Sequence, residues 1–311
     1  NQVSSILRRS IPVQGSSIST LAELGITTSA DGTLLLNDAK FDDALSSEPD
    51  AVMQLFAAFA TAEDSNISFL GSSKATLSGT YGVSISTLAS SGYNQGSSVL
   101  PDFGSGGTVV IDGDNDNLTL TIDGVQGGAI SLAHGTYTSG AALAAELQTR
   151  INEESTFASA GVTVSVSYDS LANNLTITSD ATGSDSTVEV VSVDTNTPST
   201  LGFIVGSGTA GVDIGGSIDG VLASGSGNIL TAGAGSDAEG LRLEVNGTTL
   251  GSRGNVTFTR GAASELDALI ERLLDIESGL SNRIDSIENR LDTIEERREE
   301  LELRWVKVRE R

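Results

Sequence analysis

The most regular alternation of hydrophobic and polar positions lies in residues 264–311. Apolar side chains recur there in steps of four and three, the heptad pattern by which helices pack in a coiled coil. Only Glu277 and Arg298 interrupt the apolar positions. This seam consists of Leu266, Ile270, Leu273, Leu280, Ile284, Ile287, Leu291, Ile294, Leu301, Trp305 and Val308. A helix of this length would extend about 70 Å, too far to lie across a small core. The pattern therefore favours a coiled-coil stalk over an amphipathic helix packed on its own domain.

Residues 1–59 predict helices with one hairpin. The opening segment NQVSSILRRS is helical in pattern, and the turn Ala30-Asp31-Gly32 joins two short apolar strands, a strong hairpin signal. Asn37 or Asp38 can cap a following helix, which would place Phe41 and Leu45 on one face. A further helix begins at Pro49, where the missing N–H costs nothing, and carries an apolar stripe of Val52, Leu55, Phe56 and Phe59.

Residues 60–262 predict short strands, glycine-rich turns and one helix. The clearest unit covers residues 106–206, where strands precede and follow the helical pattern ALAAELQTRIN. Leu143, Leu147 and Ile151 lie on one face of that helix. The segment VTVSVSY alternates strictly, so it predicts a strand with one buried face. The unit therefore predicts one helix covering an antiparallel sheet.

The segments YGVSIS, SIDGVL, LRLEVNG and NVTFTR flank this unit and predict the strands of a second β unit. The fold class expected is α+β, with antiparallel β-rich head domains inserted in a helical domain that ends in a long coiled-coil helix. The predicted domains are residues 1–59 (helices and hairpin of a leg domain), 60–105 with 207–262 (outer β unit), 106–206 (inner β-β-α-β-β module) and 263–311 (coiled-coil helix of the leg domain).

Composition and charge exclude several classes of protein. The formal net charge of −24 leaves no basic patch for nucleic acid. The chain has no cysteine, so disulfides and thiolate metal sites are impossible. It has no apolar run of about 18 residues that would span a membrane. Because Asn1 opens inside a helical pattern without an initiator methionine, the chain is expected to be a fragment of a longer protein.

Candidate chemistry is sparse. Asp112, Asp114 and Asp116 alternate as in a calcium-binding loop, and Asp123 stands at the twelfth position. Asn117 replaces the loop glycine, however, and a strand pattern follows, so a solvated turn is favoured. His134, the single histidine, has no serine or cysteine motif around it. We therefore expect no catalytic residues, no metal site and no cofactor, and the chain is not expected to be an enzyme.

Two segments resemble the bacterial flagellar filament capping protein, also called flagellar hook-associated protein 2. STLAELGITTSADGTLLLNDAKFDDALSSEPDAVMQLF at 19–56 resembles the start of that family's C-terminal region, and GLSNRIDSIENRLDTIEERREELELRW at 279–305 resembles its terminal coil. Residues 122–152 are similar to a small module of flagellin-related proteins, and residues 217–247 to a glycine-rich segment near it. The departure from the family is the insertion of about 200 residues between the two main matches.

The resemblance implies a ring of identical subunits at the tip of the flagellum, with helical legs in the filament and β-rich heads outside. Such a cap is exported from the cell and shelters flagellin while it folds and inserts, without a chemical step. It also implies that the seam binds the family's N-terminal helix, which this sequence lacks, and neighbouring subunits. The expected partners are further copies of the chain, flagellin, the hook–filament junction proteins and host surface glycans, with no nucleic acid or membrane.

The alternative from another class is a secreted adhesin or carbohydrate-binding β protein on a coiled-coil stalk. Sugar sites usually stack rings on Trp or Tyr, yet aromatic residues make up only 4% of the chain. Its single tryptophan, Trp305, lies in the seam. Flagellin and the hook–filament junction proteins would share the 122–152 module but not the hairpin followed by two helices.

Overall fold

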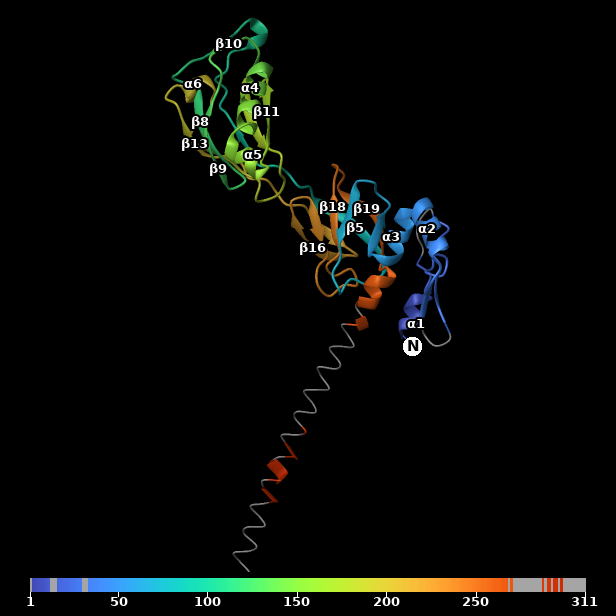
Figure 1. The fold of residues 1–311 in the computed structure, drawn as a ribbon. Helices are drawn as coiled ribbons and strands as arrows, with labels where there is room; N and C mark the ends of the chain where they lie inside the picture. The colour runs from blue at the N-terminus through green and yellow to red at the C-terminus, as the bar shows by residue number, and fades with distance from the viewer. Residues whose placement is uncertain are drawn as a thin grey trace, which may run out of the picture. The chain divides into compact units, whose positions relative to one another are not determined.

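The computed structural model describes residues 2–11, 16–29, 33–267 and 269–270, with positions 287, 290–291, 293–295 and 297–298. The chain divides into two compact units, and each is described by itself. Unit 1 combines residues 1–59 with 259–311, and unit 2 comprises residues 60–258 (Figure 1). The described part of the chain is α+β, with antiparallel strand pairs and few helices.

The described residues before position 59 of unit 1 form three short helices and one hairpin. They are α1 (Gln2–Leu7), β1 (Ile26–Thr28), β2 (Leu34–Leu36), α2 (Asp38–Ser47) and α3 (Pro49–Phe56). The predicted hairpin is confirmed, because β1 and β2 pair antiparallel. The Asn37 side chain caps α2 by accepting a hydrogen bond from the Lys40 N–H at 3.1 Å. Pro49 occupies the first turn of α3, as predicted.

The core of unit 1 lies between the N-terminal segment and α3. Its buried members are Ile11, Ile18, Leu21, Leu24, Ala44, Ala51, Val52, Leu55 and Ala262. The apolar stripe predicted for α3 is confirmed for Val52 and Leu55, which are buried, and for Phe56, which packs beside them. Phe59 packs on the same core but lies in the next strand, because α3 ends at Phe56. On α2 the prediction is only partly right, because Phe41 packs on the core whereas Leu45 is exposed. The small Ala44 is the residue of α2 that reaches the interior.

Unit 2 contains an eight-stranded antiparallel sheet in the order β3-β19-β5-β15-β16-β17-β18-β4. Its strands are β3 (Phe59–Ala62), β4 (Ile67–Gly71), β5 (Gly79–Thr87), β15 (Gly215–Ile218), β16 (Val221–Ser226), β17 (Ile229–Thr231), β18 (Arg242–Val245) and β19 (Gly251–Thr259). The four segments predicted as strands of the outer unit all lie in this sheet. At one point β5 ends directly beside the start of β15, where Thr87 pairs with Gly215.

The segment between β5 and β15 forms an inner module. Its strands are β6 (Tyr93–Gln95), β7 (Val109–Ile111), β8 (Asn117–Ile122), β9 (Val125–Ser131), β10 (Gly135–Tyr137), β11 (Val164–Asp169), β12 (Asn174–Ser179), β13 (Val188–Val193) and β14 (Gly206–Ser207). Its helices are η1 (Phe103–Ser105), α4 (Gly140–Asn152), α5 (Ser155–Ala160) and α6 (Thr197–Thr200). They form a four-stranded sheet β14-β13-β8-β9, a three-stranded sheet β11-β12-β6 and the pair β10-β7.

One core joins these layers. Leu143, Leu147 and Ile151 of α4 are fully buried, as the sequence predicted, and α4 lies along β11 (Figure 1). Phe157 of α5 is also fully buried against β9. A side chain at Gly127 of β9 would come within 2.6 Å of the Phe157 ring, so a glycine is required at that close approach.

The pairing differs from the predicted limits of the inner module at both ends. β6, which the sequence assigns to the outer unit, pairs with β12, and β14 extends the sheet through β13. Two isolated bridges, Ser90 with Val212 and Tyr93 with Thr209, lie further out in the sequence. The paired residues therefore reach from about residue 90 to residue 212, beyond the predicted limits of 106–206.

Residues 60–262 are expected to fold without the rest of the chain, because the eight-stranded sheet and the inner module have their own buried residues. Expressed alone, this segment should melt in a cooperative transition by circular dichroism. The intact chain is the control and should show the same transition. A broad loss of signal in the isolated segment would contradict this expectation.

Candidate functional site

The terminal helix begins with two different apolar faces. Residues 262–267 and 269–270 are helical. Ala262 and Leu269 are buried, whereas the predicted seam residue Leu266 is half-buried and Ile270 is 48% exposed. At about 100° per residue these two faces lie roughly 70° apart around the helix. The helix therefore packs in its first turns through a face that is not the predicted seam.

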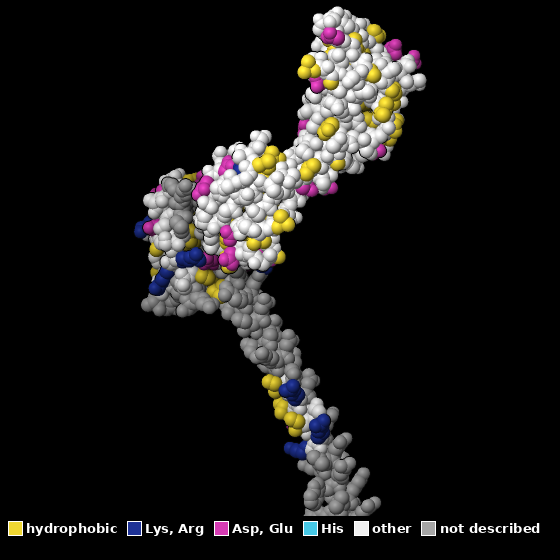
Figure 2. Space-filling view, turned by 180° about the vertical axis from the view of Figure 1, so that it is seen from behind, with side chains coloured by type: hydrophobic (Ala, Val, Ile, Leu, Met, Phe, Trp, Pro, Cys, Tyr) yellow, Lys and Arg dark blue, Asp and Glu magenta, His cyan; other side chains and the backbone are white. Residues whose placement is uncertain are grey.

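The seam is exposed where the structure describes its later positions. Ile287, Leu291 and Ile294 are helical and 57%, 54% and 62% exposed. Figure 2 shows hydrophobic and basic side chains together on this part of the terminal segment. In a coiled coil, positions of this kind would be covered by another helix. The other seam positions, Leu273, Leu280, Ile284, Leu301, Trp305 and Val308, lie outside the described residues, and the coiled coil stays a prediction.

A second exposed apolar surface lies on the hairpin of unit 1. Leu34, Leu35 and Leu36 of β2 are each more than half exposed, and Met53 of α3 is 61% exposed. Successive residues of a strand point to opposite faces, so both faces of this hairpin carry leucine. An isolated two-stranded hairpin is marginally stable in water. The sequence predicted the hairpin but gave no sign that all three leucines would remain uncovered.

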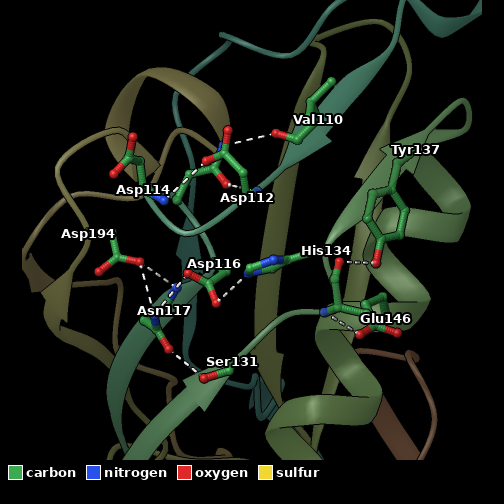
Figure 3. A network of polar contacts seen from close by, with 12 residues as sticks. Val110, Asp112, Asp114, Asp116, Asn117, Ser131, His134, Tyr137, Glu146 and Asp194 are labelled. Carbon is green, nitrogen blue, oxygen red and sulfur yellow. Dashed lines mark hydrogen bonds and ion pairs between the residues drawn. The ribbon is translucent and has the colours of Figure 1, made fainter.

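Polar residues of the inner module gather at the turn between β7 and β8 (Figure 3). The Asp112 carboxylate accepts a hydrogen bond from the Asp114 N–H at 3.1 Å, and the Asn115 side chain donates to the Val110 carbonyl at 2.9 Å. The Asn117 N–H donates to the Asp194 carboxylate at 2.7 Å. The Asp112 contact is that of an ordinary Asx turn, whereas the Asp194 contact ties the start of β8 to the residue after β13.

His134 and Asp116 connect this turn to the start of β10. His134 Nε2 lies 3.1 Å from Asp116 Oδ2, and the Asp116 side chain is largely buried while that of His134 is exposed. Next to His134, the Ala133 N–H donates to Glu146 of α4 at 2.9 Å (Figure 3). The hydrogen bond from Arg150 holds the pKa of Glu146 below its usual value. These contacts fix strand ends to one another and to α4.

The residues of this turn do not assemble a cation site in the structure. No group of three or more His, Asp or Glu side chains in the described part of the chain is arranged to hold a metal ion. Asp123, the predicted twelfth position, instead accepts hydrogen bonds from Ser179 and Thr187 at 2.7 and 2.9 Å. Asp123 therefore serves a different turn from Asp112 and Asp114.

Millimolar calcium is expected to leave the melting temperature of the chain unchanged. A bound ion at about 100 times its dissociation constant would add roughly 2.7 kcal/mol to the free energy of unfolding. Thermal melting with calcium and with a chelator makes the comparison, with magnesium as the control for ionic strength. A calcium-specific rise of several degrees, lost in an Asp112→Asn variant, would contradict the turn interpretation.

Comparison with known proteins identifies one part of the chain. Residues 1–100 match the family model described as flagellar hook-associated protein 2 C-terminus. The resemblance seen in the sequence is thereby confirmed. The matched residues include the hairpin of exposed leucines, α2, α3 and the first strands of unit 2. The chain matches none of the curated protein sequences with which it was compared.

Solved structures of flagellar cap proteins are similar to the chain. The D1-D2-D3 domains of FliD from Escherichia coli share 20% identity over 73% of each chain, with a TM-score of 0.40. FliD (HAP2) from Pseudomonas aeruginosa PAO1 shares 16% identity over 73% of this chain and 94% of that one, with a TM-score of 0.39. FliD from Bdellovibrio bacteriovorus shares 15% identity over 61% and 99%, with a TM-score of 0.35.

Among the described residues, no helix is both long enough and apolar enough to cross a bilayer.

Proposed function

We propose that the chain is the C-terminal part of a flagellar filament capping protein that promotes the folding and insertion of flagellin during filament growth. The observation that carries this proposal is the family match over residues 1–100. It covers the segment whose hairpin and paired helices suggested the resemblance. The exposed stripe of Ile287, Leu291 and Ile294 adds support, because a cap subunit needs an apolar surface for assembly.

The mechanism proposed is steric and conformational. Several copies would form a ring outside the cell at the filament tip, with unit 1 and the terminal helix as the leg and unit 2 as the head. The ring would shelter newly exported flagellin until it has joined the lattice. Its proposed partners are further copies of the chain, flagellin and the hook–filament junction proteins, with host surface glycans as ligands of the head. The stalked adhesin is not favoured, since residues 1–100 match the capping-protein family model.

Electron microscopy of the native full-length protein tests this proposal. Gold-labelled antibodies against unit 2 should decorate the distal ends of flagellar filaments. Cells without the gene should release unpolymerised flagellin, and the full-length gene should restore filaments. Label confined to the cell body, or normal filaments in the deleted strain, would overturn the proposal. A strain lacking flagellin is the control, because its filament ends are absent.

A further inference from the structure

The turn that follows β18 contains the single Asn-Gly pair of the sequence, Asn246 with Gly247. Both residues are exposed, and Gly247 takes a positive φ of 82°. An asparagine amide can be attacked by the main-chain nitrogen of the next residue, and glycine hinders this attack least because it has no side chain. This pair is therefore the place at which the chain is most open to reaction with itself.

The peptide bond between these two residues lies beside a buried cation. Arg253 is 4% exposed, and its Nη2 donates to the Asn246 carbonyl at 2.9 Å. A Cβ atom added to Gly247 would lie 3.8 Å from the same Nη2. A charged donor draws electrons from the carbonyl and from the nitrogen conjugated with it. The Gly247 N–H therefore loses its proton more readily than that of a solvated peptide, and the deprotonated nitrogen is the nucleophile.

A second donor acts on the group that is attacked. Asn228, in the turn between β16 and β17, donates from Nδ2 to Asn246 Oδ1 at 3.0 Å and to Glu244 Oε1 at 3.1 Å. Because an ionised carboxylate only accepts, Glu244 fixes which end of the Asn228 amide faces Asn246. The negative charge that develops on Asn246 Oδ1 during the attack therefore meets a donor that is already in place.

Main-chain hydrogen bonds hold the turn between its neighbours. The Asn246 N–H donates to the Asn66 carbonyl at 2.8 Å, and the Val245 N–H donates to the Asn228 carbonyl at 2.9 Å. Gly247 lies beyond the end of β18, so its N–H takes no part in the strand pairing there. The turn thus keeps both donors next to the reacting residues, as an intramolecular reaction requires.

We propose that Asn246 is a self-modification site, at which the chain converts its own asparagine to isoaspartate. The Gly247 nitrogen gives its proton to the solvent and bonds to the Asn246 Cγ. The Cγ–Nδ2 bond then breaks, and the amide leaves as ammonia with a proton from the solvent. The product is a cyclic imide that contains the Gly247 nitrogen and both former carbonyl carbons of Asn246. Water is the only further reactant.

Arg253 decides where water opens the imide. Its guanidinium polarises the former main-chain carbonyl of residue 246, so water adds to that carbon and its bond to the Gly247 nitrogen breaks. The main chain then runs through Cγ, and the new carboxylate faces the guanidinium. Addition of water to Cγ would instead give ordinary aspartate. The contact therefore favours isoaspartate over aspartate.

The modification lengthens the turn by one methylene group and adds one negative charge. The Arg253 guanidinium binds the Asn246 and Thr249 carbonyls and the Asp64 carboxylate, and the lengthened turn no longer matches these positions. We expect the modified chain to unfold at a lower urea concentration than the fresh chain. Urea unfolding of chains separated by ion exchange measures the difference. Equal midpoints would contradict the effect assigned to the longer turn.

Peptide mapping by mass spectrometry tests the site in the 311-residue chain, kept folded at mildly alkaline pH. Asn246 should be converted before any other asparagine, and about tenfold faster than in a synthetic peptide of residues 241–252, which lacks both donors. Asn66 and Asn255 are internal controls, since they are exposed in the same unit but precede the branched residues Ile67 and Val256. A rate in the folded chain equal to or below that of the peptide would overturn the proposal.

Substitution of the two donors tests their roles. Asn228→Ala should slow the reaction about fivefold, and Arg253→Met at least about tenfold. The matched control, Thr80→Ala, removes an exposed hydrogen bond to Thr257 elsewhere in the same sheet and should leave the rate unchanged. Circular dichroism shows that each variant is folded. Because Arg253→Met weakens unit 2, Asn228→Ala decides the test, and an unchanged rate in that variant would overturn the proposal.

Discussion

Replacing Ile287 and Leu291 with aspartate is expected to abolish the proposed ring assembly of the full-length protein while unit 2 remains folded. Both side chains are more than half exposed in the chain alone, so the substitutions cost little there. In an assembled seam they would place carboxylates in an apolar interface, at several kcal/mol for each buried charge. Thermal melting of the 311-residue chain measures whether unit 2 remains folded. Motility and flagellin leakage, in cells carrying the full-length variant, measure whether assembly is lost.

The matched control changes two exposed leucines of unit 2 to aspartate. Leu171 and Leu222 are 94% and 80% exposed, so Leu171→Asp with Leu222→Asp adds the same charge away from the seam. Cells with this control should swim and retain their flagellin. Normal swimming by the Ile287→Asp, Leu291→Asp strain would show that the seam is not the assembly surface. Unfolding of unit 2 in that variant would instead show that the seam packs within the chain.

Replacing Arg253 with methionine is expected to destabilise unit 2 by at least about 3 kcal/mol. Its guanidinium is buried in β19 and donates to the Asp64 carboxylate, to the Asn246 carbonyl at 2.9 Å and to the Thr249 carbonyl at 3.2 Å. Methionine fills much of the same volume but donates no hydrogen bond, so those acceptors lose their charged partner. Urea unfolding measures the change, with the exposed Arg242→Met of β18 as the control. Equal stability of the two variants would contradict the role assigned to Arg253.

The pH dependence of this effect follows from Asp64. The hydrogen bond from Arg253 lowers the pKa of Asp64 from 3.8 to about 2. Because the folded pKa lies below the unfolded one, the interaction stabilises the fold above about pH 3.8, and this stabilisation is lost as the pH falls through about 2. The difference in stability between the unaltered chain and Arg253→Met should therefore narrow in that range.

Secondary structure is predicted best from the sequence where the pattern involves only residues that are close together along the chain. The helical stripe of Leu143, Leu147 and Ile151 became the buried face of α4. The alternation in VTVSVSY became β11, although Val162 precedes the strand. Asn173 takes a positive φ of 52° in the turn to β12, the conformation for which asparagine is suited. In each of these three cases, residues close together in the sequence are enough to favour the observed helix, strand or turn.

The remaining features depend on partners that are distant in the sequence. β6 and β14 contain only three and two residues, with no apolar alternation, and they exist because β12 and β13 accept their hydrogen bonds. Leu45 lies on the expected face of α2 but stays exposed, since the core ends at Ala44. Likewise the burial of Leu269 in place of Ile270 depends on where the helix meets its neighbours. Periodicity gives the apolar face of a helix but does not say which part of it is covered.

The pairing of Thr87 with Gly215 brings the two ends of the inner module together at one point of the outer sheet. The inner module leaves the sheet after one residue of this pair and returns before the other, so β5 and β15 would form a plain hairpin without it. The strand order of the sheet therefore does not depend on which domain is inserted between β5 and β15, and a different domain inserted between Thr87 and Gly215 would leave it unchanged.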